Sequence, residues 1–302
     1  MQQATRRRGR RSRAAVAVTA AAVLGITGCD AVGGEAPAPS TGPKQGRPSP
    51  KPTPVWDTSP SSVAAVGDSI TRGFDACSVL TDCPEVSWAT GSSEKVDSLA
   101  VRLLGRAGAA ERSWNHAVTG ARMADLPGQM ARAVRHAPHL VAVMVGANDA
   151  CRDTTSAMTP VAGFRADFQE AMRTLRAARP KAQVYVASVP DLKRLWSQGR
   201  TNPLGKQVWK LGICPSMLGD ADALDTAATL RRETVQKRVE DYNRVLEEVC
   251  AEDERCRFDG GAVYEYRFGT DQLSRWDWFH PSIDGQARLA EIAYRTVTAK
   301  RP

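Results

Sequence analysis

The stretch VAAVGDSIT, residues 63–71, joins a short apolar run to a turn that carries polar side chains. An apolar run of this length is typical of a buried strand. Gly67 allows a sharp turn after the strand, because glycine has no side chain to clash. Ser69 then lies at the carboxyl end of the strand, where open α/β sheets bind their ligands. A strand followed by an ordinary Asp68/Ser69 helix cap gives the same pattern, so this stretch alone does not settle a function.

Strand-like and helix-like segments alternate along the rest of the chain. The predicted strands are 63–67, 113–118, 139–146, 184–189 and 256–258. The predicted helices are 96–105, 123–135, 164–178, 227–249 and 283–298. Alternating β and α segments indicate parallel strands joined by right-handed crossovers. We therefore predict an α/β fold, a three-layer α/β/α sandwich with a central, mainly parallel sheet of about five strands.

Three further motifs follow in order along the chain: Gly120 after the second predicted strand, GAND at 146–149 after the third, and DWFH at 277–280. Together with Ser69, this ordered set resembles the GDSL/SGNH hydrolase family of esterases and lipases over roughly residues 61–298. The resemblance implies the flavodoxin-like SGNH-hydrolase fold and an ester hydrolase that needs no cofactor and no metal. No Gly-x-Ser-x-Gly motif occurs, which argues against the common α/β-hydrolase arrangement.

Ser69 is the candidate nucleophile, and a serine hydroxyl needs a base to remove its proton. His280 has Asp277 three residues before it, so the Asp277 carboxylate can hold the imidazole in one tautomer. The resemblance assigns these three residues as nucleophile, base and acid, although some members of the family use a main-chain carbonyl in place of the acid. The remaining histidines are interpreted as core, rim or loop residues: His116, His136 and His139.

An oxyanion hole needs donors arranged around a developing negative charge, and Gly120 and Asn148 fit by residue type. Both residue types are also common in turns that have no catalytic role. The resemblance places the oxyanion donors at these two positions and at the main-chain N–H of Ser69. Asp68 and Asp149 are expected to cap or brace their loops.

Two insertions, residues 74–88 and 191–222, are expected to shape the mouth of the site, the second as a long, loop-like segment. Its apolar side chains suit an acyl chain or pack against the sheet: Leu192, Leu195, Trp196, Val208, Trp209 and Met217. These features favour a lipase or lipid esterase. O-deacetylation of a carbohydrate remains an alternative, and a non-catalytic lipoprotein that binds an envelope component is a third reading.

The N-terminal region indicates export. Residues 1–28 hold six arginines, no acid and a short apolar run, which is typical of a signal peptide. The segment ITGC at residues 26–29, which ends in Cys29, looks like a bacterial lipobox. We therefore expect lipid on Cys29. Residues 29–60 are rich in Pro, Gly, Ser and Ala and are predicted to form a disordered tether. A catalytic domain over 61–302 would then be held at the outer face of the membrane, with release of some protein left open.

Removing Cys29 leaves six cysteines, an even number that implies disulfides in an exported chain. Fifteen connectivities are possible. Two pairs of cysteines that are close in sequence would each close a short loop, and the remaining two cysteines would form a long-range pair. Similar secreted actinobacterial esterases show the same sequential pairing. The expected pairs are Cys77–Cys83, Cys250–Cys256 and Cys151–Cys214.

The net charge of +8 does not indicate nucleic-acid binding. Most of it comes from the arginines of residues 1–28, whereas residues 61–302 hold 32 basic and 30 acidic side chains. No basic run interleaved with aromatic residues remains in that part. The expected partners are therefore an ester substrate and, through Cys29, a membrane, and we expect a monomer.

Overall fold

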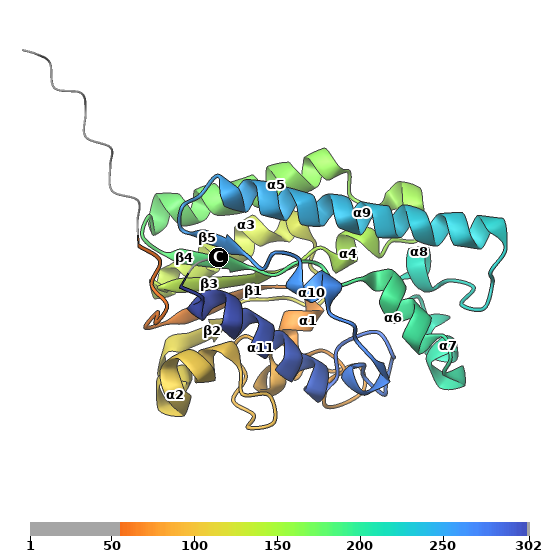
Figure 1. The fold of residues 1–302 in the computed structure, drawn as a ribbon, viewed down its shortest axis with the longest axis horizontal. Coiled ribbons are helices and arrows are strands. Elements are labelled where there is room, and N and C mark those ends of the chain that lie inside the picture. The colour runs from red at the N-terminus through yellow and green to blue at the C-terminus, as the bar shows by residue number, and fades with distance from the viewer. Residues whose placement is uncertain (1–54, 301–302) are drawn as a thin grey trace, which may run out of the picture. The chain divides into compact units, whose positions relative to one another are not determined.

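The computed structural model describes residues 55–300. Its centre is a five-stranded sheet in the order β2-β1-β3-β4-β5, and every neighbouring pair of strands is parallel (Figure 1). The strands are β1 (Val63–Gly67), β2 (Ser113–Asn115), β3 (Leu140–Met144), β4 (Gln183–Val186) and β5 (Cys256–Phe258). All residues of β1, β3 and β4 are buried, as expected for parallel strands covered on both faces.

Helices cover both faces of the sheet. Helices α3, α5 and α9 pack on one face and α2 and α11 on the other, so the fold is a three-layer α/β/α sandwich, as predicted (Figure 1). The α-helices are α1 (Ser69–Arg72), α2 (Leu99–Arg112), α3 (Leu126–Ala133), α4 (Ala147–Ala150), α5 (Val161–Ala178), α6 (Leu192–Gly199), α7 (Pro203–Trp209), α8 (Pro215–Leu218), α9 (Thr226–Ala251), α10 (Ala262–Glu265) and α11 (Ile283–Thr298). Helix α2 is interrupted at Gly105, whose φ of 69° is not helical.

The order of the strands fixes where a ligand can bind. From β1 the chain crosses to β2 on one side, and it then returns to β3 on the other side of β1. The reversal leaves a crevice at the carboxyl ends of β1 and β3, which is where doubly wound sheets bind their ligands. Gly67 at the end of β1 pairs with Met144 at the end of β3, so the turns that follow these two strands face each other.

The predicted strands and helices are all present, but several of their bounds differ. The second strand ends at Asn115 rather than residue 118, and the fourth ends at Val186 rather than residue 189. The first predicted helix begins at Leu99 rather than residue 96; its predicted end, Gly105, is where α2 is interrupted before a further helical segment runs to Arg112. Helix α5 begins three residues before the predicted start, at Val161.

The insertion at 191–222, expected to be loop-like, instead folds into the three short helices α6, α7 and α8. Asp191 and Asn202 cap the first two helices by accepting backbone N–H donors, and prolines occupy the first position of α7 and α8. Caps and an N-terminal proline compensate for the few internal hydrogen bonds of such short helices.

The domain begins before residue 61. The Trp56 indole donates to the carbonyl of Val297 and lies under the guanidinium of Arg257, while the N–H of Asp57 donates to Gln183. Residues 56–60 therefore belong to the folded domain and not to the expected tether. The signal peptide at 1–28, the lipidated Cys29 and the rest of the tether lie outside the described residues.

The six remaining cysteines form three disulfides, in the pairing that was expected: Cys77–Cys83, Cys151–Cys214 and Cys250–Cys256. Two of them close loops with a sequence separation of 6, and the third joins the end of α4 to the start of α8 across a separation of 63. Disulfides are typical of chains that fold outside the cytosol. Among residues 55–300, no helix is both long enough and apolar enough to cross a membrane.

Candidate active site

Ser69 is the first residue of α1, directly after the strand β1. The turn between them depends on Gly67, whose φ is 147° and whose added Cβ would lie 2.0 Å from the carbonyl oxygen of Met144. Asp68 caps the helix, because its Oδ1 accepts the N–H of Ile70 at 3.0 Å. The Ser69 hydroxyl is thereby held at the carboxyl end of the sheet on a short, rigid helix.

His280 and Asp277 arrive at Ser69 from the loop before α11. The Ser69 Oγ lies 2.8 Å from His280 Nε2, and His280 Nδ1 lies 2.5 Å from Asp277 Oδ2. The other oxygen of Asp277, Oδ1, accepts the backbone N–H groups of Phe279 and His280, each at 2.9 Å. A side-chain carboxylate, and not a main-chain carbonyl, therefore orients this imidazole.

Hydrogen bonds from neighbouring segments hold the turn that carries Asp277 and His280. Trp278 adopts a left-handed backbone, with φ 50°, and its N–H donates to the carbonyl of Ser274 at 2.8 Å. The Trp209 indole on α7 donates to the carbonyl of Asp277 at 2.7 Å. A left-handed tryptophan costs energy and persists only where surrounding contacts hold it. Helix α7 is thus part of what positions the acid.

The electrostatics of the pair favour an ion pair. Burial alone would raise the pKa of Asp277, but the charge of His280 and the hydrogen bonds from its ring and from backbone N–H groups outweigh burial and lower it. Burial alone would lower the pKa of His280, but the Asp277 carboxylate outweighs this and raises it, with smaller contributions from Asp75 and Asp68. The arrangement therefore stabilises an imidazolium at position 280.

Asn148 and Gly120 lie beside Ser69. Asn148, in α4 after β3, donates one amide hydrogen to the carbonyl of Ala121 at 3.0 Å, and an amide has a second hydrogen to donate. Gly120 has φ 83°, a left-handed conformation that favours glycine. The N–H of Ser69 belongs to the first turn of α1, where N–H groups have no partner within the helix. Three groups of the kind that can donate to an oxyanion thus line the same cavity.

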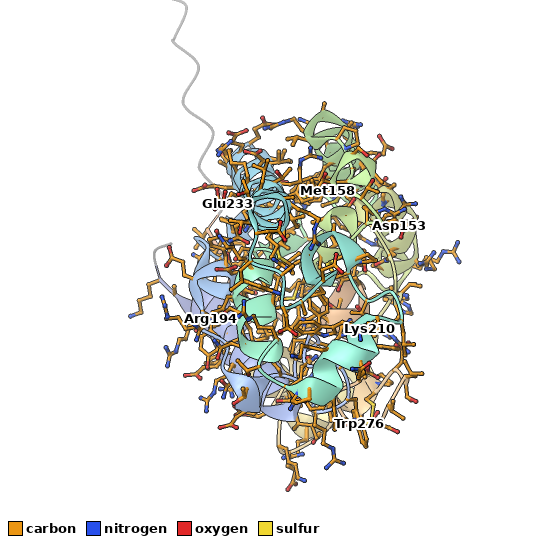
Figure 2. All side chains as sticks on the ribbon, turned by 90° about the vertical axis from the view of Figure 1, so that its right-hand side faces the viewer. Asp153, Met158, Arg194, Lys210, Glu233 and Trp276 are labelled. Carbon is orange, nitrogen blue, oxygen red and sulfur yellow. A yellow bond between two sulfur atoms is a disulfide. The ribbon has the colours of Figure 1, made fainter. Side chains whose placement is uncertain are left out.

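These residues share one small cavity of about 220 Å³. Its polar wall is formed by Ser69, Gly120, Asn148 and His280, and its apolar wall includes Leu192, Leu195, Ile213 and Phe279. Cys151 and Cys214, which form a disulfide, also line it. Helices α6 and α7 enclose this end of the molecule, as Figure 2 shows for Arg194 on α6 and Lys210 at the end of α7.

A sequence profile of the GDSL-like lipase/acylhydrolase family matches residues 63–293, which is most of the described domain. The chain belongs to this family. Lipases and acylhydrolases cleave ester bonds, so the family match sets the general chemistry of the site. A search of curated proteins finds no match.

Solved structures of esterases are similar to this GDSL-like chain at a distance. They include a catalytic mutant of an acetylxylan esterase from Geobacillus stearothermophilus (18% identity, TM-score 0.48, 78% of this chain and 94% of that one). An extracellular lipase from Streptomyces rimosus matches with 18% identity and a TM-score of 0.44, over 79% of this chain and 100% of that one. A family 3 carbohydrate esterase from Clostridium thermocellum matches with 14% identity and a TM-score of 0.46, over 78% and 94%. These likenesses are too distant to indicate a substrate.

The other histidines of this GDSL-like chain lie away from Ser69. His136 stacks between Trp114 and His116, with ring centroids 4.5 and 5.1 Å away, at the β2 side of the sheet. The Nδ1 of His139 lies 2.7 Å from the hydroxyl of Ser61 before β1. His280 is therefore the histidine within hydrogen-bond distance of Ser69.

Asp68 and Asp149 brace loops, as their positions suggested. Asp149 Oδ2 accepts the N–H of Met123 at 2.9 Å and so ties α4 to the segment after Gly120. Burial raises the pKa of Asp68 to about 7 and that of Asp149 to about 6. Both carboxyls therefore hold a proton at higher pH than an exposed aspartate does.

Sequence reasoning missed three residues of the site. Asp75 is buried beside Asp277, and the Phe74 ring stands edge-on to the His280 imidazole with centroids 5.1 Å apart. Ile213 lines the cavity just before Cys214. All three lie in the insertions expected to shape the mouth of the site, but an acid and an aromatic just before a disulfide form no motif that would single them out.

Two groups of side chains have ligand atoms close enough to hold a metal ion, within the part of the chain that the structure describes. In the first, Cys77 and Cys83 are bonded to each other and have no thiolate to offer. In the second, Asp75, Asp277 and His280, the Nδ1 of His280 is engaged by Asp277 and both oxygens of Asp277 accept hydrogen bonds. Neither group has the free ligand atoms that a metal site needs.

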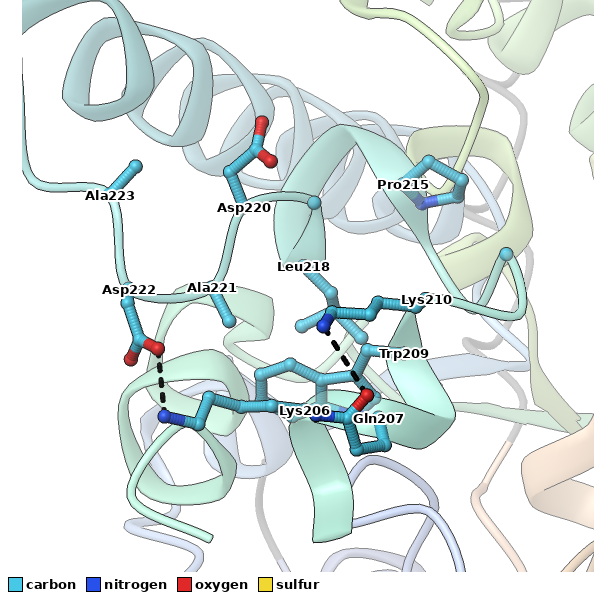
Figure 3. Close-up of a pocket in the computed structure, with 12 residues that line it drawn as sticks. Lys206, Gln207, Trp209, Lys210, Pro215, Leu218, Asp220, Ala221, Asp222 and Ala223 are labelled. Carbon is cyan, nitrogen blue, oxygen red and sulfur yellow. Dashed lines mark hydrogen bonds and ion pairs between the residues drawn. The ribbon is translucent and has the colours of Figure 1, made fainter. Parts of the chain in front are cut away.

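A larger cavity of about 640 Å³ lies between α7 and the segment after α8 (Figure 3). Lys206 and Asp222 form an ion pair across it at 2.7 Å, and the Lys210 ammonium donates to Gln207 at 3.3 Å. None of Ser69, His280 and Asn148 lines this cavity. We therefore assign this larger cavity no role in the chemistry at Ser69.

Proposed function

We propose that this chain is an exported serine hydrolase of carboxylic esters that acts through an acyl-Ser69 intermediate. The observation that carries the proposal is the hydrogen-bonded series from Ser69 Oγ through His280 to Asp277, at 2.8 and 2.5 Å. A serine in contact with a base that is itself oriented by a buried acid is the arrangement that nucleophilic catalysis requires. This assigns Ser69 as nucleophile, His280 as base and Asp277 as the orienting acid.

The reaction follows from these roles. His280 Nε2 takes the hydroxyl proton as Ser69 Oγ attacks the ester carbonyl, and Asp277 stabilises the imidazolium that forms. The N–H groups of Ser69 and Gly120 and the Asn148 amide hold the oxyanion. The imidazolium then gives its proton to the departing alcohol, which leaves acyl-Ser69. Water, deprotonated by His280, attacks the acyl group and releases the acid by the same route.

The size of the cavity favours short acyl groups. At about 220 Å³ it is smaller than the roughly 300–1,000 Å³ typical of sites for larger ligands. Leu192 and Leu195 on α6 place apolar atoms along its wall, which suits an acyl group. The small cavity also favours a second candidate, O-deacetylation of a carbohydrate, because an acetyl group fits it equally well.

We also propose that residues 1–28 are a lipoprotein signal, that Cys29 carries lipid and that residues 29–55, the expected tether without the part that belongs to the domain, form the tether. The lipobox-like sequence before Cys29 supports this, as does the disulfide bonding of all the other cysteines. Disulfides form and persist outside the cytosol.

The test is hydrolysis of p-nitrophenyl esters from acetyl to palmitoyl by the chain made under oxidising conditions. We expect kcat/KM to peak at acetyl to butyryl and to fall for longer chains. Ser69→Ala removes the nucleophile, and loss of a catalytic serine typically lowers kcat by roughly 10⁴–10⁶-fold. Ser61→Ala, a change in a serine outside the cavity, serves as the matched control and should leave the rates unchanged.

Two outcomes would contradict the proposal. Activity that survives in Ser69→Ala would show that another group is the nucleophile. A folded, disulfide-bonded protein without activity on any of these esters would remove the general esterase. In that case, acetate release from an acetylated polysaccharide would decide whether the carbohydrate candidate holds.

A further inference from the structure

Asp75 is a buried acid that the proposed mechanism does not use. It lies after α1, two residues before the Cys77–Cys83 disulfide, and only 1% of its surface is exposed. Its backbone is left-handed, with φ 57°, a conformation that costs energy for a residue other than glycine. A buried carboxyl on a strained backbone is kept in place by its surroundings and invites a functional explanation.

The contacts of Asp75 direct its carboxyl toward the catalytic pair. Oxygens of Asp75 and Asp277 and a ring nitrogen of His280 all lie within 4.8 Å of one another. The Oδ1 of Asp75 accepts the N–H of Leu80, and the N–H of Asp75 donates to the carbonyl of Thr81 at 3.0 Å. The bond from Leu80 holds the Asp75 carboxyl where it lies close to both Asp277 and His280.

Ser274 fastens the Asp75 loop to the catalytic turn. Its hydroxyl donates to the carbonyl of Asp75 at 2.6 Å, and its N–H donates to the carbonyl of His280 at 2.7 Å. Its own carbonyl accepts the N–H of Trp278 at 2.8 Å. One residue thus holds the two segments together, although Asp75 and Ser274 are 199 positions apart in the chain.

We propose that Asp75 is a positioning residue of this site, a second carboxyl that acts through Asp277 to stabilise the imidazolium of His280 when Ser69 gives up its proton. The inference rests on the proposed function, because the imidazolium forms only if Ser69 is the nucleophile. The established family match assigns no role to this position. Asp75 does not touch the reacting atoms, so it acts on the strength of the base and not on the substrate.

The charges around His280 support this role. The acids that face the imidazole are Asp277 on its own turn, Asp75 in the segment after α1 and Asp68 at the end of β1. Burial, followed by repulsion from Asp277, raises the pKa of Asp75 to about 6. Above this pH Asp75 is negatively charged and favours a positive imidazole, because an opposite charge within about 4–6 Å stabilises the charged form.

The test compares Asp75→Asn with the wild-type chain on a short-chain p-nitrophenyl ester between pH 4 and 9. Asparagine keeps the shape and the acceptor for Leu80 but carries no charge. We expect kcat to fall about tenfold at pH 8 with KM unchanged, the amount by which one pKa unit changes the base equilibrium. We also expect the acid limb of kcat/KM to move to lower pH, since the imidazolium loses a stabilising charge.

Glu85→Gln is the matched control, because it removes one negative charge from an exposed position of the same 74–88 insertion, just after the Cys77–Cys83 disulfide. It should leave kcat and the acid limb where they are. Asp75→Ser, a second neutral variant, should shift the limb in the same direction as Asp75→Asn, and it takes over the test if Asp75→Asn does not fold.

An unchanged acid limb and kcat in a folded neutral variant would overturn the inference. A lower melting temperature without a shifted limb would also overturn it, because it would reduce Asp75 to a structural residue. Failure of the proposed function can be told apart from failure of this inference. In the former case the wild-type chain would be inactive or Ser69→Ala would stay active.

Discussion

The Asp68 carboxyl caps helix α1 through its Oδ1, while its Oδ2 has no hydrogen-bond partner among the residues that the structure describes. Burial, reinforced by the nearby Asp149, raises its pKa from 3.8 to about 7. The folded state therefore binds this proton more tightly than the unfolded state does. The stabilisation that results is complete below about pH 4 and is lost as the pH rises through 7.

We predict that Asp68→Asn removes this pH dependence. Asparagine accepts the Ile70 N–H as a helix cap but does not ionise. The free energy of unfolding of the variant, relative to wild type, should therefore increase between pH 4.5 and pH 8. Urea denaturation at the two pH values measures it, and parallel curves for the two proteins would show that Asp68 is not the group responsible.

Single residues differ in how far the sequence predicts them. Ser69 and Asn148 each follow a predicted strand and His280 precedes a predicted helix, all within short motifs, and the structure brings them into one cavity. Asp75 has no such motif, because its environment is created by Ser274 and Asp277 from a distant part of the chain. The functional importance of a carboxyl such as that of Asp75 depends on the residues that bury it. A single sequence does not show which residues these are.

The same contrast holds for helices and strands. Strands β1 and β3 were predicted because a strand covered on both faces is a continuous apolar run, which is visible in the sequence. Helices α6, α7 and α8 were missed, since they have 8, 7 and 4 residues and depend on caps and neighbours for stability. Helices this short are marginal by themselves.

We predict that Cys151–Cys214 and Cys250–Cys256 differ in how much they contribute to the free energy of unfolding and in whether they support the active-site cavity. In the chain-entropy description, closing a loop of about 63 residues with Cys151–Cys214 is worth roughly 4 kcal/mol, and closing a loop of about 6 with Cys250–Cys256 roughly 2 kcal/mol. The first pair also lines the cavity, whereas Cys256 begins β5 at the opposite end of the sheet.

The double variant Cys151→Ser/Cys214→Ser should therefore lose more stability and also lower kcat/KM, because α8 and Ile213 are no longer tied to α4. Cys250→Ser/Cys256→Ser should lose about half as much stability and keep its kcat. Urea denaturation and ester hydrolysis on the same samples measure both effects. Equal losses of activity in the two variants would contradict the assignment of the first disulfide to the site.

The whole molecule has two functional ends. The chain enters the domain at Trp56 and Asp57, and Asp57 donates to Gln183, the first residue of β4. Ser69 and Asn148 follow the last residues of β1 and β3. Because all the strands are parallel, entry and active site lie at opposite ends of the sheet. In the proposed lipoprotein, the chain that leads to Cys29 therefore leaves the domain at the end opposite the active site.

This geometry makes the membrane anchor and the catalysis separable. We predict that Cys29→Ala moves the protein from the membrane fraction to the medium or the soluble fraction, because no lipid is attached. In the proposal, the lipid sets where the protein resides and takes no part in the chemistry at Ser69. The kcat/KM for a soluble short-chain ester should be the same for both forms.

Fractionation of cells that express each variant, followed by ester hydrolysis on matched amounts of protein, measures both parts of this prediction. An anchored form that hydrolyses the soluble ester much more slowly than the released form would mean that the membrane obstructs the site, contrary to the opposite placement of entry and catalysis. A Cys29→Ala variant that stays in the membrane fraction would show that the anchor lies elsewhere. The esterase assignment would survive either result, because it depends on Ser69, His280 and Asp277 alone.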